Sequence, residues 1–446
     1  MMREPAFTLL SRPRKVPLEG KRVVVLGLGD TGLSVARWVR EQGGTPRVAD
    51  TRAAPPRKDD YAGELFAGPF TNGLLNGADL VCVSPGLSLE EPVVMEARRR
   101  KIPIVGDVEL FAWQNRSQVL AITGTNGKTT VTALTGHLLR TAALDCEVAG
   151  NIGPAVLDAL MKRRAAPPAV WVLELSSYQL ETTWSLAPHA AAVLNLTEDH
   201  FDRYAGLEDY GAAKARIFQG AGVQILNRDD PRVLAMALPG RRQITFGLSG
   251  SADFGIRDGK LMQGSKTLVD VSELPIRGWH NAANALAACA LASTVNVSVE
   301  ALAAGLKTFK GLPHRLELVA TSGGVEWYDD SKGTNVGATI AALKGLAKPS
   351  ILILGGEGKG QDFSPLAPVV AQFAAHVLLI GRDAPLIAKA VPGERCESLE
   401  EAVHRAAELA NPGEAVLLSP ACASFDMFRD YKHRGEVFAA AVKTLT

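Results

Sequence analysis

Apolar and polar positions alternate along the chain in a way that predicts short buried strands separated by helices. Runs rich in β-branched residues recur from end to end, and the clearest are Val23–Leu28, Val119–Thr123 and Ile351–Leu354. Each of these three runs opens onto a glycine-rich loop. Strands that alternate with helical segments are typical of βαβ units built around parallel sheets. We therefore predict an α/β protein with one layered domain for each loop.

The predicted domains comprise residues 1–112, 113–311 and 312–446. The second boundary falls at Gly311-Leu312-Pro313, where glycine and proline favour a hinge. A chain of 446 residues is long enough for two to four domains, which agrees with this division.

Composition narrows the class of protein. Hydrophobic residues make up 47% and charged residues 21% of the chain, as in a folded soluble protein. The 48 basic and 47 acidic residues leave a net charge of +1, which argues against a nucleic-acid partner. The five cysteines include no C-x-x-C pair, so neither a disulfide framework nor a zinc site is expected. With no signal-peptide pattern and no membrane-length apolar run, we expect a cytoplasmic protein without a membrane partner.

The first loop, Gly27–Gly32, matches G-x-G-x-x-G and follows an apolar strand. A helix is predicted over residues 33–42, and Asp50 ends the next strand. In a dinucleotide-binding fold an acid near this distance contacts a ribose, and the helix N-terminus binds phosphate. A tight turn without a ligand is the alternative. The pattern does not distinguish NAD from another nucleotide.

The second loop gives a stronger signal for phosphate binding, because a lysine and a hydroxyl residue open the following helix. Its main-chain N–H groups can surround phosphate oxygens, Lys128 can reach the outer phosphates, and the Thr129 hydroxyl can bind Mg²⁺. Ile122 occupies the outer glycine position of the common phosphate-loop pattern, so the loop differs in detail from that of most NTPases. A chance turn is the alternative. The loop comprises Gly124, Thr125, Asn126, Gly127, Lys128, Thr129 and Thr130.

Acidic and basic side chains follow the next strands. Glu174 comes directly after the buried run 170–173, at the sheet edge where ligands of parallel sheets bind. The predicted strand 190–196 leads to His200, and a predicted helix over 207–218 carries Lys214. Since Mg²⁺ prefers oxygen ligands, Glu174 is the better metal ligand, and His200 is a weaker candidate that has a structural role as its alternative.

Further polar clusters follow strands of the C-terminal third. Three cationic groups and several hydroxyls lie near predicted helix N-termini and together can hold a dianion. Helix capping is the alternative for single residues such as Asp330 and Ser424. The clusters are His314–Glu317, Asp329–Asn335 before a helix from about Val336, Lys359 in the loop 355–360, and Ser419–Asp426 after the run 415–418.

Taken together these motifs resemble the Mur ligases of peptidoglycan synthesis over nearly the whole chain. The motifs DDSKGTN and SPACASFD are similar to those of the branch that adds D-glutamate. The shorter glycine spacing at Ile122 is normal in this family. The resemblance rests on residues 27–34, 84–86, 124–130, 151–153, 174–180, 195–203, 280–287, 314–317, 329–335 and 419–428.

The resemblance implies three domains: an N-terminal Rossmann-like domain for a uridine-nucleotide substrate, a central P-loop ATPase-like domain with a parallel sheet, and a C-terminal Rossmann-like domain for an amino acid. It also implies ATP and Mg²⁺ as cofactors, a monomer, and UDP-N-acetylmuramoyl-L-alanine and D-glutamate as the small-molecule substrates.

Site residues follow from the same resemblance by motif position. The UDP-substrate would contact Gly29, Asp30, Thr31, Asp50, Thr51, Arg52, Ser84, Gly86, Asn151 and His200. ATP would contact the loop 124–130 together with Asn281, Arg315 and Asp330. D-Glutamate would contact Lys332, Thr334, Lys359, Ser424, Phe425 and Tyr431, the last in a position where relatives carry Phe.

The implied reaction joins a carboxylate to an amine through an acyl phosphate. Lys128, Glu174, His200 and Lys214 are the expected catalytic residues, and Thr129, Glu174, His200 and Lys214 the expected metal ligands. A plain ammonium at Lys214 would repel a metal. In the family the matching lysine is carbamylated by CO₂, which turns it into an oxygen donor.

Three other functions remain open. An NAD-dependent oxidoreductase would use the first loop and Asp50 but leaves Lys128 and Glu174 without purpose. A non-catalytic nucleotide-binding protein has no physical need for Lys128, Thr129, Glu174 and His200 together. A ligase of the same family that uses a different amino acid is the nearest alternative.

Overall fold

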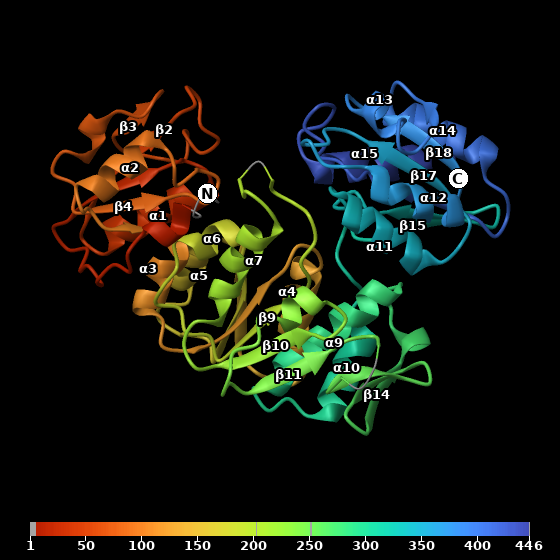
Figure 1. Ribbon diagram of the computed structural model, residues 1–446, viewed down its shortest axis with the longest axis horizontal. Coiled ribbons are helices and arrows are strands. Elements are labelled where there is room, and N and C mark those ends of the chain that lie inside the picture. The colour runs from red at the N-terminus through yellow and green to blue at the C-terminus, as the bar shows by residue number, and fades with distance from the viewer. Residues whose placement is uncertain (1–5, 202, 250–251, 446) are drawn as a thin grey trace.

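The computed structural model describes residues 6–201, 203–249 and 252–445, and it contains three sheets in three domains. Figure 1 shows the N-terminal and C-terminal domains on separate sides above the central domain. No helix in these ranges is both long and apolar enough to cross a membrane.

The N-terminal domain has a five-stranded parallel sheet of order β3-β2-β1-β4-β5. Its glycine loop lies between β1 and α1, and a Cβ on Gly32 would collide with the carbonyl oxygen of Gly27. Only glycine lets the helix approach the strand this closely. The elements are η1 (Ala6–Leu9), β1 (Arg22–Leu26), α1 (Asp30–Glu41), β2 (Thr45–Asp50), β3 (Leu65–Ala67), η2 (Asn72–Leu75), β4 (Leu80–Val83), α2 (Pro92–Arg99), β5 (Ile104–Val105) and α3 (Asp107–Gln114).

The central domain has a nine-stranded sheet of order β14-β13-β12-β11-β10-β9-β6-β8-β7. Pairing is parallel from β7 to β12, and the helices α4 and α9 pack against each other on it. The elements are β6 (Gln118–Thr123), α4 (Lys128–Thr141), β7 (Cys146–Gly150), α5 (Val156–Lys162), β8 (Val170–Glu174), α6 (Ser177–Glu181), β9 (Ala190–Val193), α7 (Leu207–Ala215), η3 (Arg216–Phe218), β10 (Val223–Asn227), α8 (Pro231–Leu234), β11 (Gln243–Phe246), β12 (Phe254–Arg257), β13 (Lys260–Gln263), β14 (Lys266–Asp270), η4 (Val271–Glu273), α9 (Trp279–Ser293) and α10 (Val299–Thr308).

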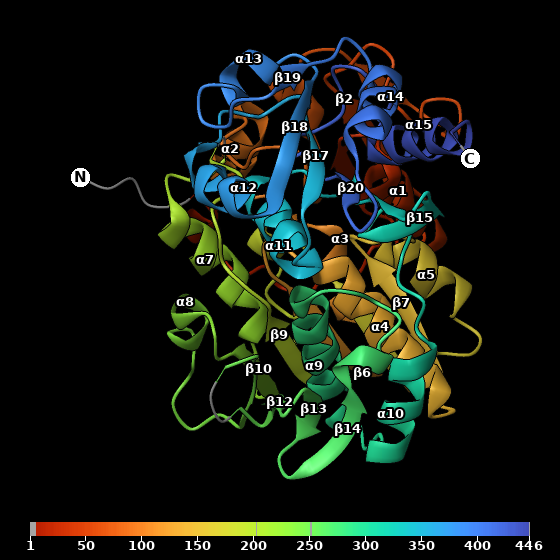
Figure 2. The ribbon, with the colours of Figure 1, turned by 90° about the vertical axis from the view of Figure 1, so that its right-hand side faces the viewer.

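The C-terminal domain has a six-stranded sheet of order β15-β16-β20-β17-β18-β19, and Figure 2 shows β17, β18 and β20 side by side. All its pairs are parallel except β15 with β16. The elements are β15 (Glu317–Ser322), β16 (Val325–Asp329), α11 (Val336–Leu346), β17 (Ser350–Gly355), η5 (Ser364–Leu366), α12 (Ala367–Phe373), β18 (Ala374–Ile380), α13 (Ala384–Ile387), β19 (Glu394–Arg395), α14 (Leu399–Leu409), β20 (Ala415–Leu418) and α15 (Tyr431–Lys443).

Strand order explains why the motifs meet. In the central sheet β6 lies between β8 and β9, so the loop after β6 is flanked by the segments that follow those two strands. In the C-terminal sheet β20 lies between β16 and β17, which brings three polar loops to one edge. Ligands of α/β sheets bind at the carboxyl ends of strands where the strand order changes direction.

Several element boundaries differ from the prediction. The first helix begins at Asp30 rather than Leu33, because the polar first turn is already helical and places an acid at the helix N-terminus. The strand predicted over 190–196 ends at Val193, and the helix predicted over 207–218 ends at Ala215 before a short 3-10 turn. Two hairpin pairs, β12-β13 and β13-β14, are antiparallel, which the βαβ pattern did not predict.

Candidate active site

The phosphate loop lies between β6 and α4, as predicted. The Lys128 ammonium donates to the carbonyl oxygens of Gly124 and Thr125, each at 2.8 Å. Burial lowers the pKa of Lys128. The neighbouring segment after β9 stabilises the loop, because Asn195 Oδ1 accepts a hydrogen bond from the Asn126 N–H at 2.8 Å. Lys128 is thus held at the loop by weak carbonyl partners that phosphate oxygens can replace.

Glu174, the last residue of β8, lies beside this loop with one carboxylate oxygen unpartnered. Its Oε1 accepts from Asn151 Nδ2 at 2.6 Å, while its buried Oε2 has no hydrogen-bond partner among the described residues. A buried anionic oxygen without a partner is costly, so such an atom indicates a ligand. Carboxylate oxygens are ligands that Mg²⁺ prefers, and Glu174 therefore fits a magnesium ion.

Lys214 and His200 both lie against the ring of Tyr210 near the loop. The Lys214 ammonium donates to the Gly124 carbonyl at 2.9 Å and lies 4.3 Å from the centre of the Tyr210 ring. Its side chain is 1% exposed, and burial together with the charge of Lys128 lowers its pKa well below the usual value. His200 Nδ1 shares a hydrogen bond of 2.7 Å with the Tyr178 hydroxyl. Asp202, from the same motif, lies outside the described residues.

A cavity of about 300 Å³ joins the phosphate loop to the C-terminal domain. Of the residues predicted to contact ATP, it is lined by Asn126, Gly127, Thr130, Asn281, Arg315 and Asp330. Lining residues with polar or aromatic side chains that the sequence analysis did not name as site residues include Asn195, Asn227, Phe246, His280 and Asn284. His280 and Asn284 belong to the motif that supplied Asn281, and Asn195 belongs to the motif that supplied His200.

Direct hydrogen bonds bring the C-terminal domain to the phosphate loop. Arg315 Nη2 donates to the Thr129 hydroxyl at 2.6 Å, and Asn335 Nδ2 donates to Asn126 Oδ1 at 3.2 Å. Residues far apart in sequence, on both sides of the predicted hinge, therefore build one site.

Asp330 and Ser424 do not cap helices. Asn335 caps α11 and Asp430 caps α15, so the capping alternative is wrong for both residues. Asp330 instead accepts hydrogen bonds from the Ser419 hydroxyl at 2.7 Å and the Leu316 N–H at 3.2 Å. Burial raises the pKa of Asp330 to about 7, in spite of the opposing effect of Ser419 and Arg315.

A second cavity, of about 840 Å³, lies between the N-terminal and central domains. It is lined by nine of the ten residues predicted to contact the UDP-substrate, and His200 does not line it. Lining residues that the sequence analysis missed include Arg37, Arg57, Asp158 and Gln179. Arg57 comes from the segment 53–76, whose pattern carries no recognisable motif.

Asp50, at the edge of this cavity, already has its carboxylate oxygens occupied. Arg52 donates to it twice, at 2.8 and 2.7 Å, and the Leu28 N–H donates at 2.7 Å. Burial would raise the pKa of Asp50, but these donors lower it to about 2. The acid thus fixes Arg52 and the glycine loop, an arrangement that disfavours a ribose hydroxyl as its partner.

The residues predicted to contact the amino acid lie on the loops that follow the neighbouring strands β16, β20 and β17 and, for Tyr431, at the start of α15. The Lys332 ammonium lies 3.9 Å from the centre of the Tyr431 ring, and burial lowers its pKa to about 8 with Arg315 adding to the effect. Phe425 is 67% exposed, and Lys359 is also exposed. Thr334 follows β16 and Ser424 follows β20, the strand next to it.

Comparison with known proteins identifies the same three parts. Residues 21–106 match the family model "Mur ligase MurD-like, N-terminal domain", residues 122–292 match "Mur ligase middle domain", and residues 314–422 match "Mur ligase, glutamate ligase domain".

Relatives match over nearly their full length. The UDP-N-acetylmuramoylalanine--D-glutamate ligase of Nitrosospira multiformis is 54% identical, with 96% of each chain covered. The protein of the same name from Thiobacillus denitrificans is also 54% identical, with 96% of this chain and 97% of that one covered. Among solved structures, UDP-N-acetylmuramate-alanine ligase from Thermotoga maritima shares the fold at 18% identity, with a TM-score of 0.61 over 96% of this chain and all of that one.

Proposed function

The chain belongs to the Mur ligase family, and we propose that it joins D-glutamate to UDP-N-acetylmuramoyl-L-alanine with the consumption of ATP, as a cytoplasmic step of peptidoglycan synthesis. The observation that carries the proposal is the phosphate loop flanked by an unpartnered buried Glu174 oxygen and reached by Arg315 from the C-terminal domain. Relatives at 54% identity that bear this name supply the choice of substrates.

Each domain has its own task in the proposal. Residues 1–112 bind the uridine nucleotide in the larger cavity, residues 113–311 bind ATP at the phosphate loop, and residues 312–446 bind the amino acid. In the proposal all three tasks are carried by one chain, and the protein acts as a monomer.

The first chemical step activates the substrate carboxylate, which is otherwise a poor electrophile. An oxygen of the terminal alanine carboxylate attacks the γ-phosphorus of ATP, and the bond to ADP breaks. Lys128 and Arg315 stabilise the charge on the moving phosphoryl group, since positioning and electrostatic stabilisation dominate phosphoryl transfer. In the second step the amine of D-glutamate attacks the acyl carbon and phosphate leaves.

Magnesium belongs to the proposal because the donors fit it. Glu174 and the Thr129 hydroxyl would hold the ion, which would offset the negative charge of the nucleotide phosphates. Glu174 has the free oxygen that this role needs, whereas the Thr129 hydroxyl must exchange its bond to Arg315.

Lys214 fits carbamylation for an electrostatic reason. Burial and the charge of Lys128 favour its neutral amine, which is the form that adds to CO₂ and releases a proton. The resulting carbamate is an anion with oxygen donors. It would relieve the repulsion between two adjacent lysines and, with His200, complete a second metal site.

The proposal is tested by phosphate release from ATP with UDP-N-acetylmuramoyl-L-alanine and magnesium, adding amino acids in turn. Release is expected with D-glutamate and much less with D-alanine, because the cationic pocket would be left unpaired. D-Aspartate, one methylene shorter, should lose about 1–3 kcal/mol of transition-state binding. Equal turnover of glutamate and alanine would contradict a pocket built on Lys332 and Lys359.

A further inference from the structure

A three-residue stretch after the predicted hinge has an unusual backbone. His314 has φ of +61° and Leu316 has φ of +49°, and Arg315 lies between them. Left-handed conformations are uncommon for residues with a Cβ, and they persist only where the surroundings fix them. One residue with this backbone stands directly before Arg315 and one directly after it. The surrounding structure therefore fixes the backbone on both sides of Arg315, and with it the direction of the Arg315 side chain.

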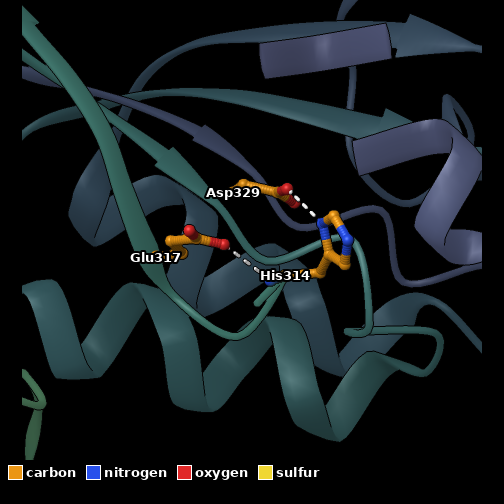
Figure 3. Close-up of side chains that lie close together, drawn as sticks. All are labelled: His314, Glu317 and Asp329. Carbon is orange, nitrogen blue, oxygen red and sulfur yellow. Dashed lines mark hydrogen bonds and ion pairs between the residues drawn. The ribbon is translucent and has the colours of Figure 1, made fainter. Parts of the chain in front are cut away.

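His314 is fixed by its ring and its backbone. Its Nδ1 and Asp329 Oδ2 share a hydrogen bond of 2.7 Å, and its N–H donates to Glu317 Oε2 at 2.9 Å, as Figure 3 shows. Its carbonyl oxygen accepts from the Lys332 N–H at 3.1 Å. The hydrogen bond to Asp329, more than the opposing burial, raises the pKa of His314. Every polar group of its backbone is thus tied to the C-terminal domain.

Leu316 is fixed on the other side of Arg315. Its N–H donates to Asp330 Oδ1 at 3.2 Å, and its side chain is 7% exposed within the apolar core of the C-terminal domain. Asp329, the last residue of β16, and Asp330, which follows it, therefore each hold one neighbour of Arg315.

Helix α15 packs directly against the His314–Asp329 pair. A Cβ on Gly435 would lie 2.5 Å from Asp329 Oδ2 and would collide with His314 Nδ1. Glycine at this position is what allows the pair to rest directly on the helix. A substitution of Gly435 would therefore disturb the pair from helix α15.

The ligand atoms of His314, Glu317 and Asp329 lie within 4.8 Å of one another, close enough for a metal site. The imidazole and Asp329 are bonded to each other, and Glu317 accepts from a backbone N–H. These hydrogen bonds tie the three side chains to one another and to the backbone, an arrangement that favours a role in holding the backbone over metal binding.

The fixed backbone on both sides determines where the Arg315 side chain lies. Its Nη2 crosses the domain boundary and donates to the Thr129 hydroxyl at 2.6 Å. Burial lowers its pKa, with Glu174 and Asp330 acting against that effect, so the guanidinium lies among the charges of the proposed site. The Arg315 side chain is long and starts close to the predicted hinge. It can reach the single hydroxyl of Thr129 only if its own backbone is held rigidly.

We propose that His314 and Asp329 are positioning residues, which lock the backbone before Arg315 so that its guanidinium points at the phosphate loop. The inference rests on the proposed function, in which Arg315 contacts the transferred phosphoryl group. Neither His314 nor Asp329 touches a reacting atom in this account. His314 also contacts Lys332 and Tyr431 of the proposed amino-acid pocket, so the effect that tests the inference is the one on ATP, which passes through Arg315.

The test compares three substitutions at one position in the full chain. His314→Ala removes the imidazole and disfavours the left-handed backbone, and kcat/KM for ATP should fall about 10²-fold through misplacement of Arg315. His314→Asn keeps a donor near the Nδ1 position and tolerates the backbone, so it should retain most activity. His314→Gly relieves the backbone without restoring the donor, and it should fall between the two. His376→Ala, on the exposed part of β18, is the control.

A double-mutant cycle then separates positioning from general structural damage. In an Arg315→Met background, His314→Ala should change kcat/KM by less than about twofold, since residues that act through one group are not additive. Equal effects of His314→Ala in both backgrounds would overturn the inference, as would wild-type activity of His314→Ala. If His314→Ala does not fold, His314→Gly takes its place in the cycle.

Binding measurements keep this inference distinct from the proposed function. The same cycle is repeated with the dissociation constant of MgATP, which requires no turnover. Failure of the wild type to release phosphate would refute the proposed function, while the MgATP cycle would still decide the positioning role. Loss of coupling in both cycles with an active wild type would refute the positioning role alone.

Discussion

The N-terminal and central domains share one hydrophobic core, whereas the C-terminal domain packs its apolar residues among themselves. One continuous cluster includes Val25 and Phe111 together with Trp171 and Tyr210. The clusters of the C-terminal domain begin at Leu316 and contain no residue before it among the described positions. The contacts that it makes with the phosphate loop are hydrogen bonds, from Arg315 and Asn335.

Buried polar groups add to the contrast. At the first junction Glu109 is fully buried and accepts from the N–H groups of Trp184 and Ser185 at 2.7 and 2.8 Å and from Trp113 Nε1 at 2.9 Å. The N-terminal and central domains share an apolar core, and the buried polar groups at their junction are hydrogen-bonded. These two domains therefore behave as one rigid body. A polar junction can open and close with little loss of apolar burial, which suits a domain that binds the last substrate.

Removal of the Lys128 ammonium should give the largest effect at the polar junction. Lys128→Met should reduce the rate of phosphate release by about 10²–10³-fold, as expected for loss of one preorganised charge-stabilising donor. Steady-state kinetics check this, with the exposed Lys162→Met as the control. Near-normal turnover of Lys128→Met would show that ATP is not bound at this loop.

Loss of Glu109 should damage the shared core instead of the chemistry. Glu109→Ala leaves two buried donors, from Trp113 and Trp184, and the half-buried Ser185 N–H without an acceptor, at about 1–3 kcal/mol for each buried donor, so unfolding should become easier by about 3 kcal/mol or more. Denaturant unfolding measures this, and the exposed Glu408→Ala should change stability by less than about 0.5 kcal/mol. If the Glu109→Ala protein were as stable as the wild type, the junction between the N-terminal and central domains would no longer contrast with the polar junction of the C-terminal domain.

Asp107, the first residue of α3, accepts a hydrogen bond from Gln179 Nε2 of the central domain at 3.2 Å and makes the first junction sensitive to pH. Burial raises its folded-state pKa from 3.8 to about 6, so its charged form opposes folding. Its contribution to stability is fully present below the unfolded pKa and is lost as pH rises through about 6. Asp107→Asn should therefore stabilise the protein by up to about 3 kcal/mol at pH 8 and by little at pH 4. Unfolding curves of both proteins at the two pH values check this, and a difference independent of pH would contradict it.

Asn335 should have the smallest effect, because one hydrogen bond to the loop is lost. Asn335→Ala removes its bond to Asn126 and the cap of α11. A single net hydrogen bond of about 0.5–1.5 kcal/mol predicts a two- to tenfold weaker apparent affinity for ATP. The control is Ser398→Ala, which removes a helix cap of the same domain away from the junction. Equal losses of ATP affinity in the two variants would assign the effect to capping.

The sequence was sufficient for features that depend on local pattern. Strand, glycine loop and helix around Lys128 follow from the order of residues, and family membership agrees with the predicted three-domain α/β fold. Contacts between segments that are distant in the chain could not be predicted from the sequence. The unpartnered Glu174 oxygen, the Leu28 N–H that donates to Asp50, and the His314–Asp329 pair arise only when segments from different parts of the chain are placed side by side.

Activation of a carboxylate by ATP is the central claim, and transfer of an isotope tests it most directly. The substrate is UDP-N-acetylmuramoyl-L-alanine with ¹⁸O in its terminal carboxylate, turned over with ATP, magnesium and D-glutamate. An acyl phosphate carries one carboxylate oxygen to phosphorus, so the released phosphate should contain one ¹⁸O atom for each amide bond formed. Amide formation accompanied by unlabelled phosphate would contradict the account.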